Sequence, residues 1–368
     1  KSRMILSHKK KKIALIGYRL SGGGSDKVMA NLSIFFEKHG FEIDIIIVLD
    51  EVNFPYSGKL VILRLLKNES NGVFNKIKRL QALRTYLNEN HFDFIIDFRF
   101  RTKIIQELIL ARFIYNTKTV FTVHSFLIDH YMPNNSWLTR LMYNHCLANV
   151  AITDEMRVLI EKKHRLENVV LIHNPVNLEE IQRKKDEEIE FDFDFIIAVG
   201  QYENDIKQFD KLIFSYAESD LFAKQIHLVI LGNGDETKLQ KVISDSQIHD
   251  FVHLLGYQNN PFKYLNKAKF LVLSSKNEGF PNVILEALAC EIPVVSFDCD
   301  FGPRDMISSF ENGILVENQN WVKLTEAMNL LVSDKVLLQK CKENSLKSIQ
   351  PFLLENIGKQ WLNLLQAD

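Results

Sequence analysis

Short runs of β-branched and aromatic residues recur along the chain and alternate with amphipathic or polar stretches. In the first half the runs predict strands over 12–17, 41–48, 92–97, 119–123, 149–153 and 169–172, with an amphipathic helix over 28–38. A second series predicts strands over 195–199, 227–231, 252–255, 270–273 and 294–297. Continuous apolar runs of this length are typical of parallel strands that helices cover on both faces. The pattern therefore predicts an α/β protein with two doubly wound, Rossmann-like units.

A charged stretch without apolar periodicity separates the two series, over residues 181–194. We therefore expect an N-terminal domain over 1–187 and a C-terminal domain over 188–351. The terminal stretch 354–365 is helical in pattern, and we expect the segment 352–368 to cross back to the first domain. Two doubly wound units imply a cleft between them, with ligand groups at the carboxyl ends of the strands.

Composition agrees with a two-domain soluble protein, since 46% of the 368 residues are hydrophobic and 25% are charged. The four cysteines are scattered and form no C-x-x-C pair. This usage predicts reduced thiols, a cytoplasmic location and no zinc site. No apolar run reaches the roughly 18–20 residues that a membrane-spanning helix needs.

Charge is divided unevenly along the chain. Residues 1–187 hold 29 Lys and Arg against 20 Asp and Glu, a net of +9, whereas residues 188–368 hold 16 against 26, a net of -10. A basic first half suggests an anionic partner, although uneven surface decoration has the same signature. The basic residues are too dispersed for the stripe that nucleic-acid binding requires, so no nucleic-acid partner is predicted.

One basic segment, residues 73–87, has apolar residues at helical spacing: Phe74, Ile77, Leu80 and Leu83. Such a helix either lies on an anionic membrane surface or covers the core of its own domain with its lysines in solvent. Together with the basic first half, the segment favours peripheral association with the inner face of the plasma membrane.

The stretch Glu278-Gly279-Phe280-Pro281-Asn282 follows the predicted strand 270–273 and leads into an apolar helix that carries Glu286. Pro281 suits the first turn of that helix, where a missing N–H costs little. The free N–H groups and the positive end of the helix dipole suit a phosphate. Glu278 and Glu286 would accept hydrogen bonds from sugar hydroxyls, although surface glutamates at such a spacing are also common without a function.

This stretch, continued through Val283, Ile284 and Leu285 to Glu286, resembles the signature of the retaining GT-B glycosyltransferases of family 4. Further landmarks of the family follow in order along nearly the whole chain. They are Gly23-Gly24-Ser25-Asp26-Lys27-Val28, His124 at the end of a strand, Asn174-Pro175-Val176-Asn177, Leu231-Gly232-Asn233-Gly234 and Leu255-Gly256-Tyr257. The resemblance implies a GT-B fold with two Rossmann-like domains.

The resemblance also implies roles for individual residues. Glu278 would contact the hydroxyls of the donor sugar, and Glu286 would bind the ribose of the nucleotide. The backbone of Gly279, Phe280, Pro281, Asn282 and Val283 would face the sugar and the diphosphate, with Tyr257 near the base. Gly23 and Gly24 would let the first domain approach the phosphates, and His124 would be the active-site histidine.

One position departs from the family pattern. The second domain of family members usually opens with Val-Gly-Arg and has a lysine six residues after the arginine, whereas this chain has Val199-Gly200-Gln201 with Lys207 at that spacing. Glutamine donates hydrogen bonds but carries no charge, so Lys207 becomes the expected ligand of the leaving diphosphate. Arg304 is a candidate to compensate for the missing charge.

By the resemblance, the chain would transfer a hexose or N-acetylhexosamine with retention of configuration, without a cofactor or a metal ion. The segment 296–307 resembles a branch of bacterial enzymes for lipopolysaccharide, capsule or lipid-linked oligosaccharides, which favours a UDP-linked donor and a saccharide or lipid-linked acceptor. Two alternatives stay open: a nucleotide-sugar-binding protein with little or no activity, which Gln201 would favour, and a GT-B-like epimerase or phosphorylase.

Overall fold

The computed structural model describes residues 10–63 and 73–366, with side chains from Ile77 onward in the second range. The chain divides into two compact units. The first comprises the chain up to Pro175 together with the segment from Ile357, and the second comprises Val176–Asn356. The boundary expected after residue 187 therefore falls later than the one in the structure.

The first unit is built on a parallel seven-stranded sheet with the order β3-β2-β1-β4-β5-β6-β7. Its strands are β1 (Lys12–Gly17), β2 (Glu42–Ile47), β3 (Lys59–Ile62), β4 (Phe94–Asp97), β5 (Lys118–Val123), β6 (Ala148–Ala151) and β7 (Val169–Leu171). Five of the six residues of β1 are buried, as a strand covered on both faces requires.

Helices and short turns connect these strands. They are α1 (Gly24–Lys38), α2 (Val73–Asn90), α3 (Ile104–Ile109), the π-helical turn η2 (Leu110–Ile114), η3 (Ile128–His130), α4 (Ser136–Tyr143) and α5 (Asp154–His164). The terminal helix α15 (Leu354–Gln366) begins in the second unit and continues in the first. Gly358 packs against the ring of Phe35 on α1, where a Cβ atom would overlap the ring. Trp361 is also buried, so the crossing of this helix into the first unit is as expected.

The second unit has a parallel six-stranded sheet with the order β10-β9-β8-β11-β12-β13. Its strands are β8 (Phe195–Val199), β9 (His227–Leu231), β10 (Val252–Leu254), β11 (Leu271–Leu273), β12 (Val294–Asp298) and β13 (Gly313–Glu317). The helices are α6 (Leu178–Lys184), α7 (Phe209–Ala217), α8 (Asp220–Ala223), α9 (Thr237–Asp245), α10 (Phe262–Lys267), α11 (Asn282–Ala289), α12 (Pro303–Met306), α13 (Trp321–Ser333) and α14 (Lys335–Ser348), followed by the 3-10 turn η4 (Gln350–Phe352).

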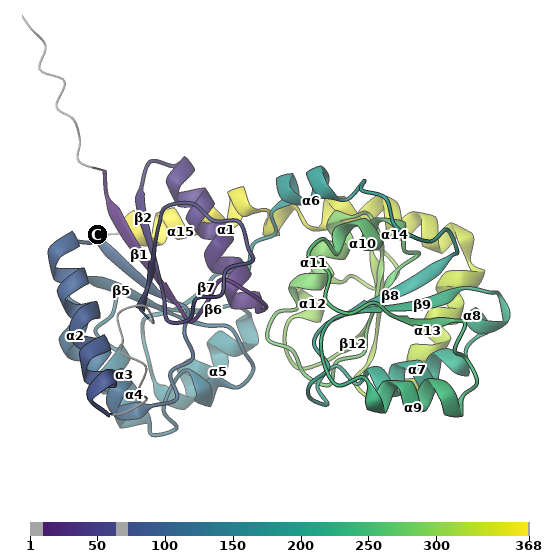
Figure 1. The fold of residues 1–368 in the computed structure, drawn as a ribbon, viewed down its shortest axis with the longest axis horizontal. Helices are drawn as coiled ribbons and strands as arrows, with labels where there is room; N and C mark the ends of the chain where they lie inside the picture. Colours follow the sequence, from purple (N-terminus) through teal and green to yellow (C-terminus); the bar gives the residue numbers. More distant parts are fainter. Residues whose placement is uncertain (1–9, 64–72, 367–368) are drawn as a thin grey trace, which may run out of the picture. The chain divides into compact units, whose positions relative to one another are not determined.

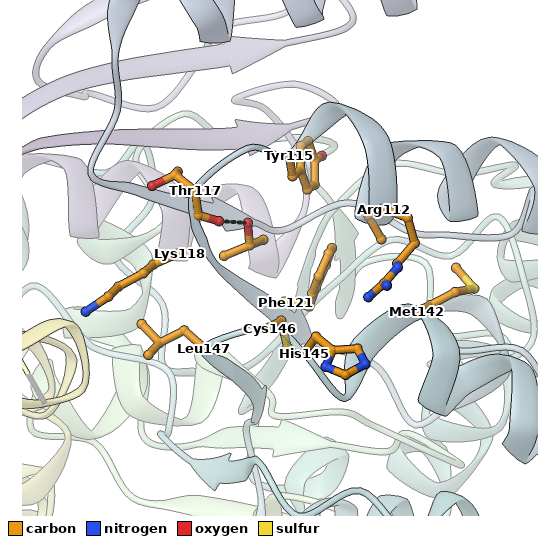
Figure 2. A pocket seen from close by; sticks show the side chains of 11 residues that line it. Arg112, Tyr115, Thr117, Lys118, Phe121, Met142, His145, Cys146 and Leu147 are labelled. Carbon is orange, nitrogen blue, oxygen red and sulfur yellow. Dashed lines mark hydrogen bonds between the residues drawn. The ribbon is translucent and has the colours of Figure 1, made fainter. Parts of the chain in front are cut away.

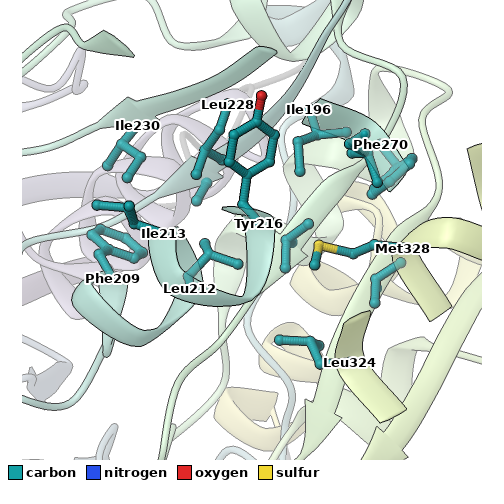
Figure 3. Packing of buried hydrophobic residues seen from close by; sticks show 14 of the residues in the cluster. Ile196, Phe209, Leu212, Ile213, Tyr216, Leu228, Ile230, Phe270, Leu324 and Met328 are labelled. Atoms are coloured by element: carbon teal, nitrogen blue, oxygen red, sulfur yellow. The ribbon is translucent and has the colours of Figure 1, made fainter. Parts of the chain in front are cut away.

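Helices cover both faces of this sheet, with α7 and α9 on one side of the strands and α10 and α11 on the other (Figure 1). Alternate residues of β8 and β9, such as Ile196 and Ile230, pack with Leu212 and Tyr216 of α7 and with Met328 of α13 (Figure 3). The prediction of two doubly wound α/β units is confirmed.

Two strands and one helix boundary differ from the sequence prediction. The strand β3 lies at the sheet edge with one exposed and three half-buried residues, so it lacks the continuous apolar run that marks the inner strands. The short strand β13 also lies at an edge and begins at Gly313. Pro281 caps α11 from outside in an extended conformation, rather than standing in the first turn of that helix.

Candidate functional site

The carboxyl ends of β8 and β11 lie side by side in the second unit, at the point where the strand order reverses. Ligands of doubly wound sheets bind at such a point. Two hydrogen bonds join the loops that follow these strands: Ser274 Oγ donates to the carbonyl oxygen of Lys207 at 2.7 Å, and Lys276 N donates to that of Ile206 at 2.8 Å. The two loops therefore form one layer above the sheet.

An ion pair between Lys207 and Glu278 occupies this layer. The distance from Lys207 Nζ to Glu278 Oε1 is 2.6 Å, and the side chains are 18% and 13% exposed. The stem of Lys207 lies over Gly200, where a Cβ atom would stand 2.6 Å from Lys207 Cε. The structure thus brings together two residues that are 71 positions apart in the sequence.

The N-terminus of α11 follows Glu278 directly. Gly279, Phe280 and Pro281 are buried, while Asn282, Val283 and Glu286 are half-buried. No side chain caps the helix at Pro281, so the positive end of the helix dipole is not offset by a capping group there. Backbone N–H groups at such an end bind phosphate oxygens well.

A loop from the neighbouring strand supports this helix end. Gly302, which follows β12, has a φ of 90°, and a Cβ atom there would stand 2.7 Å from Pro281 Cδ and 3.0 Å from Phe280 Cα. Arg304 lies just beyond, and its Nε donates to Asp298 Oδ1 at 2.9 Å. The guanidinium of Arg304 is therefore already paired with a carboxylate.

Glycines line the ends of β8, β9 and β10. Gly232 packs against the backbone of Gly200 so closely that a Cβ atom would overlap the Gly200 carbonyl oxygen. Gly232 N donates to the carbonyl oxygen of Gly256 at 2.9 Å. Gln201 and Tyr257 are exposed beside these turns. This edge of the sheet therefore presents glycine backbone and two exposed polar side chains, Gln201 and Tyr257, in the same unit as the Lys207–Glu278 pair.

The first unit holds the remaining predicted residues. Gly23 is the N-cap of α1 and Gly24 its first residue. Asp26 lies buried in the first turn, with Arg19 Nε 3.5 Å from its Oδ2. Burial raises the pKa of Asp26 to about 7, although the charge of Arg19 acts in the opposite direction. Sequence reasoning gave Asp26 no role, and its place just after the glycines was the available signal.

His124 follows β5, and its ring stacks on Phe98 with 5.6 Å between ring centroids. Both ring nitrogens are buried and meet no hydrogen-bond partner of good geometry among the described residues. Burial lowers the pKa of His124 to about 3, and the charge of Arg101 adds to the decrease, while Asn174 opposes it. The imidazole is therefore neutral.

A buried charged network lies at the end of β4, and sequence reasoning missed it. Arg99 Nη2 donates to Asp97 Oδ2 at 2.7 Å and to Glu107 Oε2 at 2.9 Å. Tyr115 Oη donates to Asp97 Oδ2 at 2.8 Å. Burial alone would raise the pKa of Asp97, but the charges of Arg99 and Arg101 hold it below its ordinary value. The available signal was an Asp that ends an apolar strand and precedes Arg-x-Arg.

The structure thus gathers one group of the predicted residues in the second unit and places the others in the first. Gathered at the carboxyl edge of the second sheet are Gln201, Lys207, Tyr257, Glu278, Gly279, Phe280, Pro281, Asn282, Val283 and Glu286. Gly23, Gly24 and His124 belong to the first unit. In the ranges 10–63 and 73–366, no group of three or more His, Cys, Asp or Glu side chains has a geometry that holds a metal ion. Among the same residues, no helix combines the length and the hydropathy of a membrane span.

Two parallel Rossmann-like sheets, with a helix N-terminus and an acidic side chain at the carboxyl edge of the second, are typical of GT-B glycosyltransferases. Residues 22–180 match the protein family described as "Glycosyltransferase Family 4", and residues 179–348 match the family described as "Glycosyl transferases group 1". The chain belongs to glycosyltransferase family 4.

Known proteins agree with this assignment. The chain is 27% identical over 370 residues to the N-acetylgalactosamine-N,N'-diacetylbacillosaminyl-diphospho-undecaprenol 4-alpha-N-acetylgalactosaminyltransferase of Campylobacter jejuni, covering 96% of this chain and 99% of the relative. The fold is similar to that of Anabaena HepE in complex with UDP and glucose, with a TM-score of 0.78, 16% identity, and 97% and 100% of the two chains covered. A mutant of TarM from S. aureus, in complex with fondaparinux, alpha-GlcNAc-glycerol and UDP, gives a TM-score of 0.77 with 18% identity over 97% and 100% of the chains.

Proposed function

We propose that this glycosyltransferase moves a hexose or an N-acetylhexosamine from a UDP-linked donor to a saccharide or lipid-linked acceptor, with retention of configuration and without a metal ion. The observation that carries the proposal is the Lys207–Glu278 pair beside the N-terminus of α11. A cation and the backbone N–H groups at a helix N-terminus suit a diphosphate, and a carboxylate next to them suits the hydroxyls of the attached sugar.

In this proposal the second unit binds the donor. Lys207 and the N–H groups of Gly279 to Val283 hold the diphosphate, while Glu278 accepts hydrogen bonds from the sugar. Glu286 binds the ribose, and Tyr257 and Gln201 lie near the base and the phosphates. Because the negative charge grows on the diphosphate as its bond to the sugar breaks, these groups stabilise the transition state more than the bound donor.

The transfer breaks the bond between the anomeric carbon and the diphosphate oxygen and forms a bond from that carbon to an acceptor oxygen. Retention requires the acceptor hydroxyl to approach the face from which the diphosphate departs, so its proton can pass to the departing oxygen. We assign His124 and the turn at Gly23 and Gly24 to the same reaction from the first unit. The neutral imidazole of His124 suits a hydrogen-bonding role better than that of a cation.

The names of similar proteins support the linkage and the substrate class. The Campylobacter relative is an alpha-transferase that acts on an undecaprenol diphosphate, and the TarM complex holds alpha-GlcNAc-glycerol with UDP. An α-linked product from an α-configured UDP-sugar is the outcome that retention predicts. A lipid-linked acceptor would bring the enzyme to the inner face of the plasma membrane, and we propose a cytoplasmic enzyme that binds there peripherally.

The first unit has a pocket that suits an anionic acceptor. It has a volume of about 110 Å³ and lies at the carboxyl ends of β1 and β2, where Tyr18 and Val48 line it. Arg79 of α2 and Lys103 before α3 supply two cations to its wall, together with the apolar Leu83. Cations beside an apolar wall are suited to a diphosphate carried on a lipid.

A panel of UDP- and GDP-sugars tests the proposal through thermal stabilisation, because a ligand that binds only the folded state raises the melting temperature. Slow hydrolysis of the stabilising donor, with chelator present, then reports catalysis and metal independence. Stabilisation by one UDP-sugar with chelator-resistant hydrolysis is expected. Stabilisation without turnover, even with acceptor, would instead identify a nucleotide-sugar-binding protein, and stabilisation by no donor would contradict the proposal. The anomeric proton coupling of the transferred sugar tests retention.

A further inference from the structure

Three apolar side chains of the first unit lie exposed on one continuous helical segment. They are Ile105 and Ile109 of α3 and Phe113 of η2, exposed by 78%, 37% and 69%. Their spacing of four residues places them along one side of the segment. Single exposed apolar residues are common on protein surfaces. A row of such residues is instead typical of a surface that binds another protein or a membrane.

The exposed charges of this segment itself have one sign. Between Phe100 and Lys118 the exposed charged residues are Lys103, Arg112 and Lys118, all cations. The acid of that stretch, Glu107, is buried and paired with Arg99. The surface is therefore apolar and basic, and it complements an anionic one.

Helix α2 lies beside this segment and adds further cations. Asn116 Nδ2 donates to Asn88 Oδ1 of α2 at 2.7 Å, and both helices line the pocket that contains Arg79 and Lys103. Lys78 and Arg84 of α2 are exposed, as are Glu89 and Ile77 of this helix, whereas its Leu83 and Leu87 are buried in the unit. The apolar residues described in α2 therefore mostly serve the core, and the exposed apolar row belongs to α3 and η2.

A basic pocket adjoins the row at the other edge of the sheet. It has a volume of about 390 Å³, and Arg112, Lys118 and His145 line it (Figure 2). Arg112 directly precedes Phe113 in η2, Lys118 opens β5, and Leu147 of the same pocket precedes β6, so the pocket lies at the amino-terminal edge of the strands. Figure 2 shows the Arg112 and His145 side chains on one side of this space and Lys118 on the other. No carboxylate is among its described lining residues, so no acidic side chain of the lining would repel a phosphate group.

We propose that the α3–η2 surface, defined as Ile105, Ile109 and Phe113 with Lys103 and Arg112, docks on an anionic phospholipid bilayer. The apolar row enters the headgroup region, and the pocket of Arg112, Lys118 and His145 receives the phosphate of a lipid head group. Apolar burial and attraction to anionic lipid together give stable yet reversible binding. This inference rests on the proposed function only in its purpose, which is to hold the enzyme where a lipid-linked acceptor lies.

Vesicle flotation tests the apolar row. Vesicles of phosphatidylcholine with phosphatidylglycerol are expected to carry the wild-type protein, and vesicles of phosphatidylcholine alone to carry far less. The double variant Ile105→Ser with Phe113→Ser is expected to bind at least about tenfold more weakly, because the transfer of even one such side chain is worth that factor. The matched control, Phe214→Ser with Val336→Ser, removes two residues of the second unit that are 58% and 81% exposed. It is expected to float like the wild type.

The pocket is tested separately. Arg112→Glu is expected to weaken flotation and to remove its dependence on phosphatidylglycerol, whereas Lys241→Glu on α9 leaves both unchanged. Soluble glycerol phosphate is expected not to release the protein. Release by it would overturn the head-group assignment in favour of a site for a soluble anion.

Flotation of the Ile105/Phe113 variant at the wild-type level, or equal loss in the Phe214/Val336 control, would overturn the docking surface. Donor hydrolysis without vesicles is measured for every variant. It is expected to stay at the wild-type rate, so failure of the docking surface and failure of the proposed function give different results.

Discussion

The two sheets have the same strand order around their first strand, β2-β1-β4 in the first unit and β9-β8-β11 in the second. The carboxyl ends of these strands nevertheless carry different side chains. In the first unit, the end of β4 carries Asp97 and the buried Arg99, Glu107 and Tyr115. In the second, the equivalent place between β8 and β11 carries Gly200 and the partly exposed Lys207–Glu278 pair. One edge is filled with charges that bind one another, and the other is lined with backbone and a single pair.

The difference separates structural charges from charges available to a ligand. Asp97 accepts from Arg99 and Tyr115, and Arg99 donates to Glu107, so these groups satisfy one another. Arg101 donates to the carbonyl oxygens of Tyr131 and Thr122 at 3.0 Å each. A charged residue at the carboxyl end of a strand is thus not by itself evidence of binding. A partly exposed pair beside a helix N-terminus is the better candidate.

The largest effect is expected from Arg99→Met, which leaves Asp97 and Glu107 buried without their cation. Breaking a buried ion pair on one side costs about 3–5 kcal/mol. We expect a loss of this size in chemical denaturation of the first unit, followed by the fluorescence of the buried Trp361. The control Arg157→Met removes exposed pairs with Asp154 and Glu161 and should lower stability far less, because solvent screens such pairs. Equal losses of stability in the two variants would show that the buried network stabilises the fold no more than an exposed ion pair does.

The second effect is expected from Lys207→Met, which removes the cation proposed for the leaving diphosphate. Loss of one donor to developing charge lowers kcat by about 10²–10³. Steady-state kinetics with the donor found in the screen measures this change. Lys323→Met, at an exposed lysine paired with Glu317, is the control and should keep full activity. If Lys207→Met is as active as the control, the diphosphate assignment is wrong.

A pH effect of intermediate size is expected at His124. The pKa of His124 is about 3 in the folded protein and 6.5 in an ordinary environment, so the unfolded chain binds the proton more tightly. The stability that the neutral ring contributes is therefore complete above pH 6.5 and is lost as the pH falls toward 3. Between pH 7 and pH 5 the loss is about 2 kcal/mol. His124→Gln should lose less stability over this range than the wild type, and parallel profiles would show that burial does not control this ring.

The smallest effect is expected from Gln201→Arg, which restores the charge usual in the family. Charge-assisted hydrogen bonds are roughly twice as strong as neutral ones, so kcat should rise by up to about tenfold. The comparison of kcat for the single variant with that for Gln201→Arg in the Lys207→Met background gives the coupling of the two positions. If Gln201→Arg raises kcat neither in the wild-type protein nor in the Lys207→Met variant, residue 201 does not contact the diphosphate.

Much of this arrangement was predictable from local patterns. Eleven strand predictions match strands of the structure, because inner parallel strands have continuous apolar runs. The edge strand β3 was not predictable in this way, since half of its environment is solvent. The helix over 73–87 was predicted, but its periodicity left open whether its apolar side faces a membrane or the core, and the side chain of Phe74 lies outside the described residues. Leu83 is buried, whereas the exposed apolar row lies on α3 and η2, which no amphipathic pattern marked.

The candidate site was only partly predictable. Resemblance selected Lys207 and Glu278 separately, but their contact depends on two loops joined by Ser274 and Lys276, which no spacing rule gives. The network of Asp97, Arg99, Glu107 and Tyr115 spans four separate segments, so its mutual satisfaction appears only in three dimensions. The sequence shows an Asp at position 26 directly after the glycines. The raised pKa of Asp26 follows from burial, which the neighbouring sequence does not predict.

The contact between Lys207 and Glu278 has a consequence for selectivity among nucleotides. With no donor bound, each group neutralises the other at 2.6 Å. A ligand that takes Lys207 alone leaves a partly buried carboxylate without its cation, which is unfavourable. An intact nucleotide sugar satisfies both at once, with its diphosphate and its hydroxyls. The pair would thus bias binding toward the loaded donor over the spent nucleotide, and so limit inhibition of the enzyme by its own product.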